Sequence, residues 1–220
     1  MNIENSLIEA KKLSTPELSD ALDYFSLPGV VYELKSVTGN RSFAGRAWTV
    51  RYIPVDHNNP GSVGDYIDQV QSDDVVVIDN AGRTDCTVWG GILSQVASKK
   101  GIAGTVINGV SRDTTVAIDA GYPIFALSHF MRTGKDRVQV AEICGAVNLG
   151  GTLVNHGDII VADTDGVVVL ELSIAEKVIN RAREMKEIED EIVKDALDGM
   201  SIKEAREKHN YHLLQRNPTK

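Results

Sequence analysis

The sequence predicts a mixed α/β protein, and three features of the chain indicate this class. An uninterrupted apolar segment at 75–78 and a largely apolar segment at 102–107 are each followed by a helix-like segment, which is typical of βαβ units. Several glycine-punctuated β segments follow beyond residue 138, and a charge-rich helical stretch comes last. We therefore expect one α/β domain over residues 1–172 and a helical C-terminal extension over residues 173–220.

The N-terminal part predicts a helix and then a strand. Thr15 is the expected N-cap and Pro16 the first helical residue, because proline is well tolerated at that position. Alternating apolar residues over 45–52 predict a half-buried strand, and the Asn and Pro-Gly cluster at 58–61 predicts the turn that closes it.

The two βαβ units are predicted next along the chain. The apolar run at 75–78 fits a strand covered on both faces, and the spacing of Val88, Ile92 and Val96 predicts a helix that ends at Gly101. The remaining elements are a strand at 102–107, a turn at 108–109, a short helix at 113–120 and a strand at 123–127.

The last part predicts short strands and then helices. The strands are expected at 138–143, 151–154, 158–162 and 166–172. We interpret 163–166 as a turn between strands, since its glycine stands at the fourth position of the motif and a calcium loop needs it at the sixth. A helix with an apolar stripe is predicted over 173–200, and a capping box beginning at Ser201 predicts a final short helix.

The composition narrows the classes of partner. The chain has 220 residues, and 23 Lys and Arg against 31 Asp and Glu give a formal charge of −8. Nucleic-acid backbones are bound by clustered Lys and Arg, so we expect no nucleic-acid partner. No window approaches the ~18 apolar residues of a membrane span, and no secretory signal stands at the N-terminus. We expect a cytoplasmic protein that acts on a small polar substrate and has no membrane partner.

Several catalytic classes lack their motifs. The sequence contains no dinucleotide-binding glycine motif, no Walker lysine, no H-E-x-x-H and no G-x-S-x-G, and its five histidines are scattered. Cys86 and Cys144 show no C-x-x-C spacing, so we expect both to be reduced core residues.

The candidate site is the pair Arg112 and Asp113, just after an apolar strand. Open α/β sheets bind ligands at the carboxyl ends of their strands. Arginine offers a planar fork for a carboxylate, and an aspartate offers an oxygen ligand for Mg²⁺ or Mn²⁺. The alternative is a solvated ion pair in which Asp113 caps the following helix.

The preceding strand has a comparable end. Glycines at 90 and 91 open the next helix, where free backbone N–H groups favour an anion. The alternative is that these glycines only allow the helix to pack closely on the sheet. No lysine stands near the Arg-Asp pair in the sequence to form a Schiff base.

Three segments resemble the RraA-like family, namely WGGIL at 89–93, GIAGTVINGVSRD at 101–113 and GDIIVADTDGV at 157–167. That family includes metal-dependent 4-hydroxy-4-methyl-2-oxoglutarate/4-carboxy-4-hydroxy-2-oxoadipate aldolases and the regulator of ribonuclease E activity A. The resemblance runs from about residue 19 to residue 169 and implies a β/β/α swivelling-type core. It also implies homotrimers or dimers of trimers, with sites at the subunit boundaries.

The resemblance also implies roles for individual residues. Asp113 would bind a divalent metal, Mg²⁺ or Mn²⁺, and Arg112 would bind the pyruvoyl oxygens of a 2-oxo acid. The backbone amides of Gly90, Gly91, Ile92 and Leu93 would receive the carboxylate. The implied activity is a C–C lyase that releases pyruvate through a metal-stabilised enolate, either as an aldolase or as an oxaloacetate decarboxylase. A non-catalytic regulator that binds a ribonuclease is the alternative.

Two positions depart from the aldolase members. The aldolase members carry one acidic residue twenty-one positions before the arginine and another three positions after the aspartate. This chain has Gly91 and Val116 at those two positions. Aldol cleavage needs a base for the C4 hydroxyl, whereas decarboxylation does not. We therefore expect decarboxylation to be favoured unless Asp85, Asp79, a carboxylate of a neighbouring subunit or a bound water replaces the missing acids.

Overall fold

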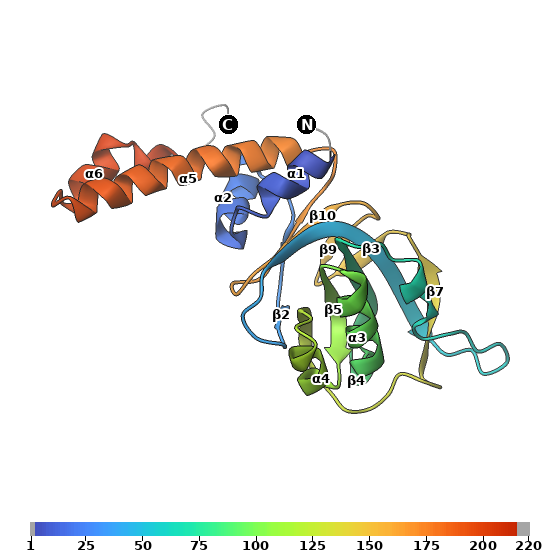
Figure 1. The fold of residues 1–220 in the computed structure, drawn as a ribbon. Coiled ribbons are helices and arrows are strands. Elements are labelled where there is room, and N and C mark those ends of the chain that lie inside the picture. The colour runs from blue at the N-terminus through green and yellow to red at the C-terminus, as the bar shows by residue number, and fades with distance from the viewer. Residues whose placement is uncertain (1–2, 215–220) are drawn as a thin grey trace.

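The computed structural model describes residues 3–214, in which a mixed sheet of nine strands carries much of the core (Figure 1). Its strands are β1 (Val30–Val31), β2 (Lys35–Ser36), β3 (Phe43–Pro54), β4 (Asp74–Trp89), β5 (Gly104–Ser111), β6 (Ile124–His129), β7 (Val138–Ile143), β10 (Ile159–Ala162) and β11 (Val167–Leu170). The order is β1-β11-β10-β3-β4-β5-β6-β2, with β7 paired to β3. Strands β3 to β6 are parallel neighbours, and the other pairs are antiparallel. A separate hairpin joins β8 (Val147–Leu149) and β9 (Thr152–Val154).

Helices α3 (Gly91–Lys100) and α4 (Thr114–Asp119) connect the parallel strands and lie against the same face of the sheet (Figure 1). Val76 belongs to the core on this face, while its neighbour Val77 belongs to the core on the opposite face, which Leu149 of the hairpin helps to close. Successive strand residues point to opposite faces, so a continuous apolar run is needed where both faces are covered. The two predicted βαβ units are confirmed.

Strands β4 and β5 are longer than the sequence predicts. The strand predicted at 75–78 continues to Trp89, and the turn predicted at 108–109 is wrong because β5 continues through it. The pairing of β4 with β5 shifts register three times in this part, and Gly82 has a left-handed backbone (φ 69°). Such bulges bend a strand without ending it. The bend brings Trp89, at the end of β4, beside Ser111, at the end of β5.

Helix α2 (Thr15–Phe25) starts one residue earlier than predicted. Its N-cap is Ser14, whose side chain accepts from the backbone N–H of Glu17, while the Glu17 carboxylate accepts from Ser14 N. Thr15 instead donates its N–H and its hydroxyl to the carboxylate of Asp163, at 2.7 and 2.6 Å. The predicted turn at 163–166 therefore also fixes the start of α2.

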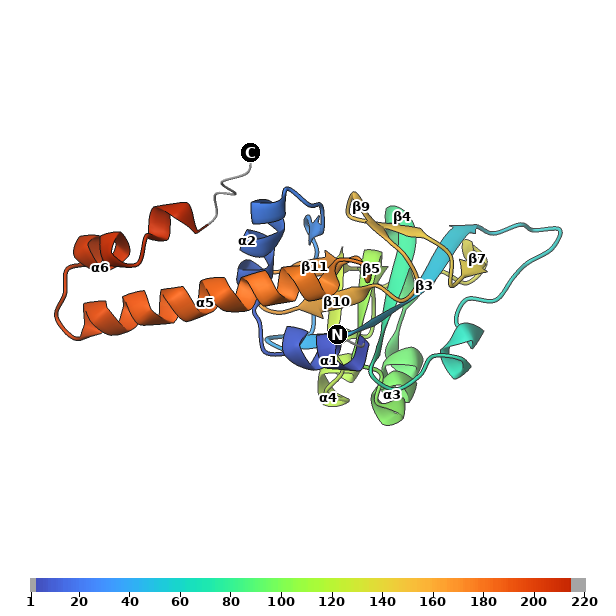
Figure 2. The ribbon, with the colours of Figure 1, turned by 90° about the horizontal axis from the view of Figure 1, so that it is seen from above.

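The C-terminal helices form an arm that leaves the body of the molecule (Figures 1 and 2). The remaining helical elements are α1 (Ile3–Ala10), α5 (Ala175–Leu197), α6 (Ile202–Lys208) and the 3-10 turn η2 (Tyr211–Leu213). The first half of α5 shares a core with α1, α2, β10 and β11, and α6 packs beside its far half. The capping box at Ser201 is confirmed. No helix within residues 3–214 is long and apolar enough to cross a membrane.

The two cysteines lie in different environments. Cys86 is buried in the core under α3 and α4, as predicted, whereas Cys144 is exposed, so its predicted core position is wrong. Cys144 follows the end of β7 with a left-handed backbone (φ 60°), which places it in a turn at the surface. Both thiols are free.

Candidate active site

A cavity of about 490 Å³ lies at the carboxyl ends of β4 and β5. Its walls are the first turn of α3, the pair Arg112 and Asp113, the segment 63–68 and the loop 133–135. The ends of β4 and β5 lie side by side here, so residues that are distant in the sequence border one cavity. Gly90, Gly91, Ile92 and Leu93 all border it, as do Arg112 and Asp113. The structure therefore gathers the predicted site residues at one place, apart from Asp85.

Gly90 allows the Arg-Asp pair to approach the start of α3. A Cβ at position 90 would lie 2.9 Å from Asp113 Oδ2 and 3.3 Å from Arg112 Nε, which is closer than side chains tolerate. Gly90 is the N-cap of α3 and supplies no side-chain cap. The N–H groups of Ile92 and Leu93 in the first turn have no partner within the helix, so they can receive an anion.

The side chain of Asp113 bonds the start of α3 and not the start of α4, the helix that Asp113 precedes. It is the N-cap residue of α4, but its backbone is left-handed (φ 56°) and its side chain makes no cap hydrogen bond there. Instead, Asp113 Oδ2 accepts a hydrogen bond of 2.9 Å from the backbone N–H of Gly91. In the alternative interpretation, the helix cap by Asp113 is therefore wrong, whereas the partly exposed ion pair with Arg112 is present. Its other oxygen, Oδ1, makes no hydrogen bond to any residue within 3–214.

Arg112 is positioned by its backbone and by Asp113. Its N–H donates to the carbonyl of Trp89 at 3.0 Å, which ties the ends of β5 and β4 together. Its Nε lies 3.5 Å from Asp113 Oδ2, and 38% of its side chain is exposed. Neither terminal guanidinium nitrogen bonds a described residue, so the planar fork is open to a carboxylate.

A metal at Asp113 would have mainly water as its other ligands. No group of three or more His, Cys, Asp or Glu within residues 3–214 could hold a metal ion. Mg²⁺ is commonly bound through one or two carboxylates while it keeps several waters. The free Oδ1 of Asp113, at the wall of an open cavity, fits that mode of binding.

The two departures from the aldolase members lie against each other. A Cβ at Gly91 would meet Val116 Cγ1 at 3.2 Å and Asp113 Cβ at 3.3 Å. Gly91 opens α3 and Val116 lies in the first turns of α4, so the two helix starts are in contact. The acidic residues that the aldolase members carry at these positions are thus both missing from one small region.

Asp85 does not reach the cavity. Its carboxylate receives two hydrogen bonds of 2.9 Å from the guanidinium of Arg83, which hold its pKa below the ordinary value. Asp79 is also engaged, since it accepts from Asn108 Nδ2 at 3.1 Å and from the backbone N–H of Asn148 at 3.2 Å. Neither of the predicted substitute acids borders the cavity.

Three charged residues at the cavity were not predicted from the sequence. Asp65 and Asp68 come from the 3-10 turn η1 (Asp65–Asp68), and Lys135 comes from the loop after β6. Lys135 thus borders the same cavity as the Arg-Asp pair, although no lysine lies near that pair in the sequence. No motif surrounds these residues, because their segments reach the site only through the fold.

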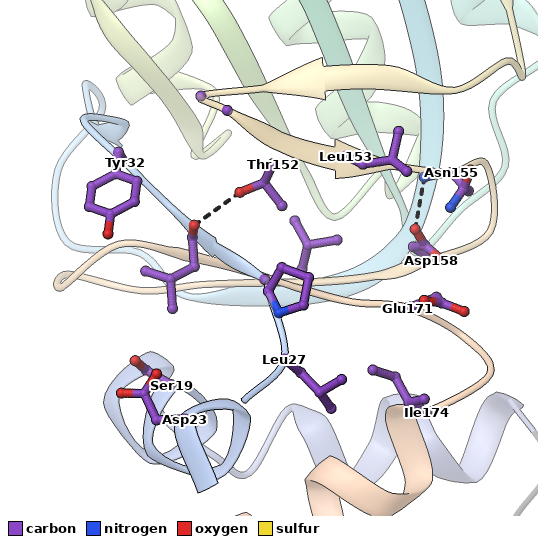
Figure 3. A pocket seen from close by; sticks show the side chains of 16 residues that line it. Ser19, Asp23, Leu27, Tyr32, Thr152, Leu153, Asn155, Asp158, Glu171 and Ile174 are labelled. Atoms are coloured by element: carbon purple, nitrogen blue, oxygen red, sulfur yellow. Dashed lines mark hydrogen bonds between the residues drawn. The ribbon is translucent and has the colours of Figure 1, made fainter. Parts of the chain in front are cut away.

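A larger cavity of about 730 Å³ lies elsewhere, between α2, the β8–β9 hairpin and the start of α5 (Figure 3). Its buried acid, Asp158, accepts from the backbone N–H groups of Asn155 and Leu172 at 2.8 and 3.1 Å. The Asp158 carboxylate in this cavity is therefore satisfied by the chain itself.

The protein is thus an α/β protein in which the ends of the parallel strands β4 and β5 lie at one cavity. The Arg-Asp pair and the N-terminus of α3 border this cavity. A model of the RraA-like family, described as Aldolase/RraA, matches residues 15–169, and the chain belongs to this family. The predicted α/β core with a C-terminal helical extension is confirmed.

Three similar proteins support this assignment. Protein DlpA of Legionella pneumophila is 33% identical over 209 residues, which are 94% of this chain but 34% of DlpA, so the chain spans about a third of that relative. A Halalkalibacterium halodurans protein, named as a proposed 4-hydroxy-4-methyl-2-oxoglutarate aldolase, is 30% identical over 84% of this chain and 85% of its own. The crystal structure of an uncharacterized Pseudomonas syringae protein has a TM-score of 0.86 at 37% identity, and covers 92% of this chain and 97% of that one.

Proposed function

We propose that the protein is a divalent-metal-dependent C–C lyase that acts on 2-oxo acids and releases pyruvate. Its substrates would be a 4-hydroxy-2-oxo diacid of the 4-hydroxy-4-methyl-2-oxoglutarate type, oxaloacetate, or both. The observation that carries the proposal is the open cavity in which Arg112, the free oxygen of Asp113 and the first turn of α3 meet.

Each of these groups has a defined task. The guanidinium of Arg112 binds the C1 carboxylate of the substrate, and the free N–H groups of the first turn of α3 support its negative charge. Asp113 would hold the metal through Oδ1 while Oδ2 keeps its bond to Gly91. A divalent cation bound there supplies positive charge close to the 2-oxo oxygen, where charge develops as the C–C bond breaks.

Lys135 raises a competing mechanism, since a lysine at the cavity can form a Schiff base with a 2-oxo acid. Lysines that act in this way are typically desolvated in apolar pockets, whereas Lys135 is exposed. Its position fits a different task, namely a second positive charge for the distal carboxylate of a diacid.

A panel of 2-oxo acids, assayed with Mg²⁺ or Mn²⁺ and with excess EDTA, tests the proposal. We expect pyruvate formation from oxaloacetate or the hydroxy-oxo diacid, and its loss on chelation. Full turnover in EDTA, or substrate trapped on Lys135 by borohydride, would contradict the metal mechanism.

The rival function is a regulator that binds a ribonuclease without catalysis. Such a protein needs no open guanidinium fork beside a free carboxylate oxygen, so the site counts against it. The outcome that favours the rival is the absence of metal-dependent turnover across the panel, together with inhibition of ribonuclease E by the purified protein.

A further inference from the structure

Aldol cleavage in this cavity lacks an obvious base, and the inference here rests on the proposed function. The positions that carry acids in the aldolase members are Gly91 and Val116, which contact each other. Asp85 is held by Arg83, and Asp79 is occupied by its own hydrogen bonds. A carboxylate from another part of the chain is therefore needed to accept the C4 hydroxyl proton.

The turn η1 brings acidic side chains to the cavity and is firmly anchored. The hydroxyl of Tyr52 donates to the carbonyl of Val63 just before the turn. Within the turn, the Tyr66 ring stacks on Trp48 with centroids 5.5 Å apart. At its end, the ammonium of Lys100 donates to the carbonyls of residues 67 and 68, each at 2.9 Å. Contacts at both ends give the turn a fixed place beside α3.

These anchors also set the direction of the turn along α3. Gly64 packs so closely on Leu93, near the start of α3, that a Cβ there would lie 3.3 Å from Leu93 Cδ1. The other end of the turn is held by Lys100, at the end of α3. Asp65 therefore lies on the side of Leu93 and Asp68 on the side of Lys100, and both side chains border the cavity.

The carboxylate of Asp65 is available for chemistry. It borders the cavity, it is exposed, and it forms no hydrogen bond or ion pair with a residue in the range 3–214. A general base must reach its proton directly or through one water, and Asp65 borders the same cavity as Arg112 and Asp113. Asp113 does not serve, because its oxygens are assigned to Gly91 N and to the metal.

We propose that Asp65 is the general base for aldol cleavage and replaces the acids missing at Gly91 and Val116. Its carboxylate accepts the proton of the C4 hydroxyl, and the O–H electrons form the new C4 carbonyl. The C3–C4 bond breaks, and its electron pair becomes the C2–C3 double bond of the pyruvate enolate. The enolate then takes a proton from solvent at C3, and Asp65 returns its proton to solvent.

The test compares Asp65→Asn with Asp119→Asn, which removes an equal charge at the exposed end of α4, outside the cavity. The values of kcat/KM are measured with Mn²⁺ for the hydroxy-oxo diacid and for oxaloacetate. We expect Asp65→Asn to slow aldol cleavage by about 10²–10⁴-fold while decarboxylation changes less than about threefold. Asp119→Asn should leave both rates within about threefold. Calorimetry should give the same Mn²⁺ affinity for the wild type and both variants.

The other outcomes overturn the proposal. Equal loss of both activities in Asp65→Asn, or weaker Mn²⁺ binding, would make Asp65 a structural or metal-binding group. Unchanged aldol cleavage in Asp65→Asn, or equal loss in Asp119→Asn, would place the base elsewhere, for example on a neighbouring subunit. A wild type that decarboxylates oxaloacetate but does not cleave the diacid would exclude a working base and leave the lyase proposal intact. Absence of both metal-dependent activities would refute the proposed function itself.

Discussion

The backbone N–H of Gly91 donates a 2.9 Å hydrogen bond to Asp113 Oδ2, and this bond joins the start of α3 to the start of α4. It uses one carboxylate oxygen to satisfy a helix N-terminus and leaves the other free. It also places Asp113 beside Arg112, with 3.5 Å between Oδ2 and the guanidinium Nε. The same contact that supports the fold therefore orients the proposed metal ligand.

Asp113→Asn should abolish metal-dependent turnover and leave the fold intact. The amide oxygen of asparagine can still accept from Gly91 N, and asparagine tolerates the left-handed backbone at this position (φ 56°). A neutral amide is a much poorer ligand for Mg²⁺ or Mn²⁺ than a carboxylate. Turnover with Mn²⁺ and the Tm from thermal unfolding check this. Asp113→Ala, the comparison variant, should cost about 1–3 kcal/mol because the Gly91 N–H loses its acceptor.

Arg112→Lys should weaken substrate binding and turnover together. Lysine keeps the positive charge, but it loses the planar pair of donors that matches a carboxylate. The open fork at Arg112 is the feature at risk, since its terminal nitrogens bond no described residue. We expect kcat/KM to fall at least tenfold for both proposed substrates, because both carry a C1 carboxylate. Near-native kinetics in this variant would place carboxylate binding elsewhere.

Gly91→Asp in the Asp65→Asn background should recover part of the aldol activity. The new carboxylate would stand where the aldolase members carry an acid, beside Asp113. We expect a gain of about tenfold or more over Asp65→Asn alone, together with a lower Tm, because the added Cβ meets Val116 Cγ1 at 3.2 Å. Gly91→Asn is the matched control, since it adds the same volume without a charge. Equal rates for the two double variants would rule out rescue by a base.

Glu17→Gln should destabilise the docking of α5 at neutral pH but much less in acid. Burial raises the pKa of Glu17, but hydrogen bonds from Lys186 and Ser14 lower it more, so the pKa lies below its ordinary value of 4.5. The stabilisation is therefore present above pH 4.5 and is lost as the pH falls through the folded-state pKa. The same pair raises the pKa of Lys186 above 10.5, so Lys186 stays charged across the neutral range.

The measurement is the free energy of unfolding in urea for wild type and Glu17→Gln. Glutamine keeps an oxygen for the capping box, so mainly the charge is removed. Because 40% of the Lys186 side chain is exposed, we expect a difference of only about 0.5–1 kcal/mol at pH 7. A difference that is unchanged well below pH 4.5 would contradict a charge-dependent contact.

The sequence by itself determined the class of fold and the place of the Arg-Asp pair. The continuous apolar run at 75–78 predicts a strand buried on both faces, and the largely apolar segment at 102–107 predicts the next strand. Residues that follow such strands reach the sheet edge where ligands bind. The sequence also predicts the capping box at Ser201 and the apolar stripe of α5, and the structure contains both. These features are local, because strand and helix periodicity is encoded by residues close together in the chain.

Only the tertiary structure decided how the site is completed. Strand β4 continues through its bulges well beyond the predicted end at residue 78, and Asp85 is bound to Arg83 outside the cavity. The anchored turn brought Asp65 to the cavity, and the packing of two helix starts brought Gly91 against Val116. Contacts of this kind depend on strand register and side-chain direction across distant segments, and a one-residue shift in register reverses the face on which a side chain lies. No local pattern records that information.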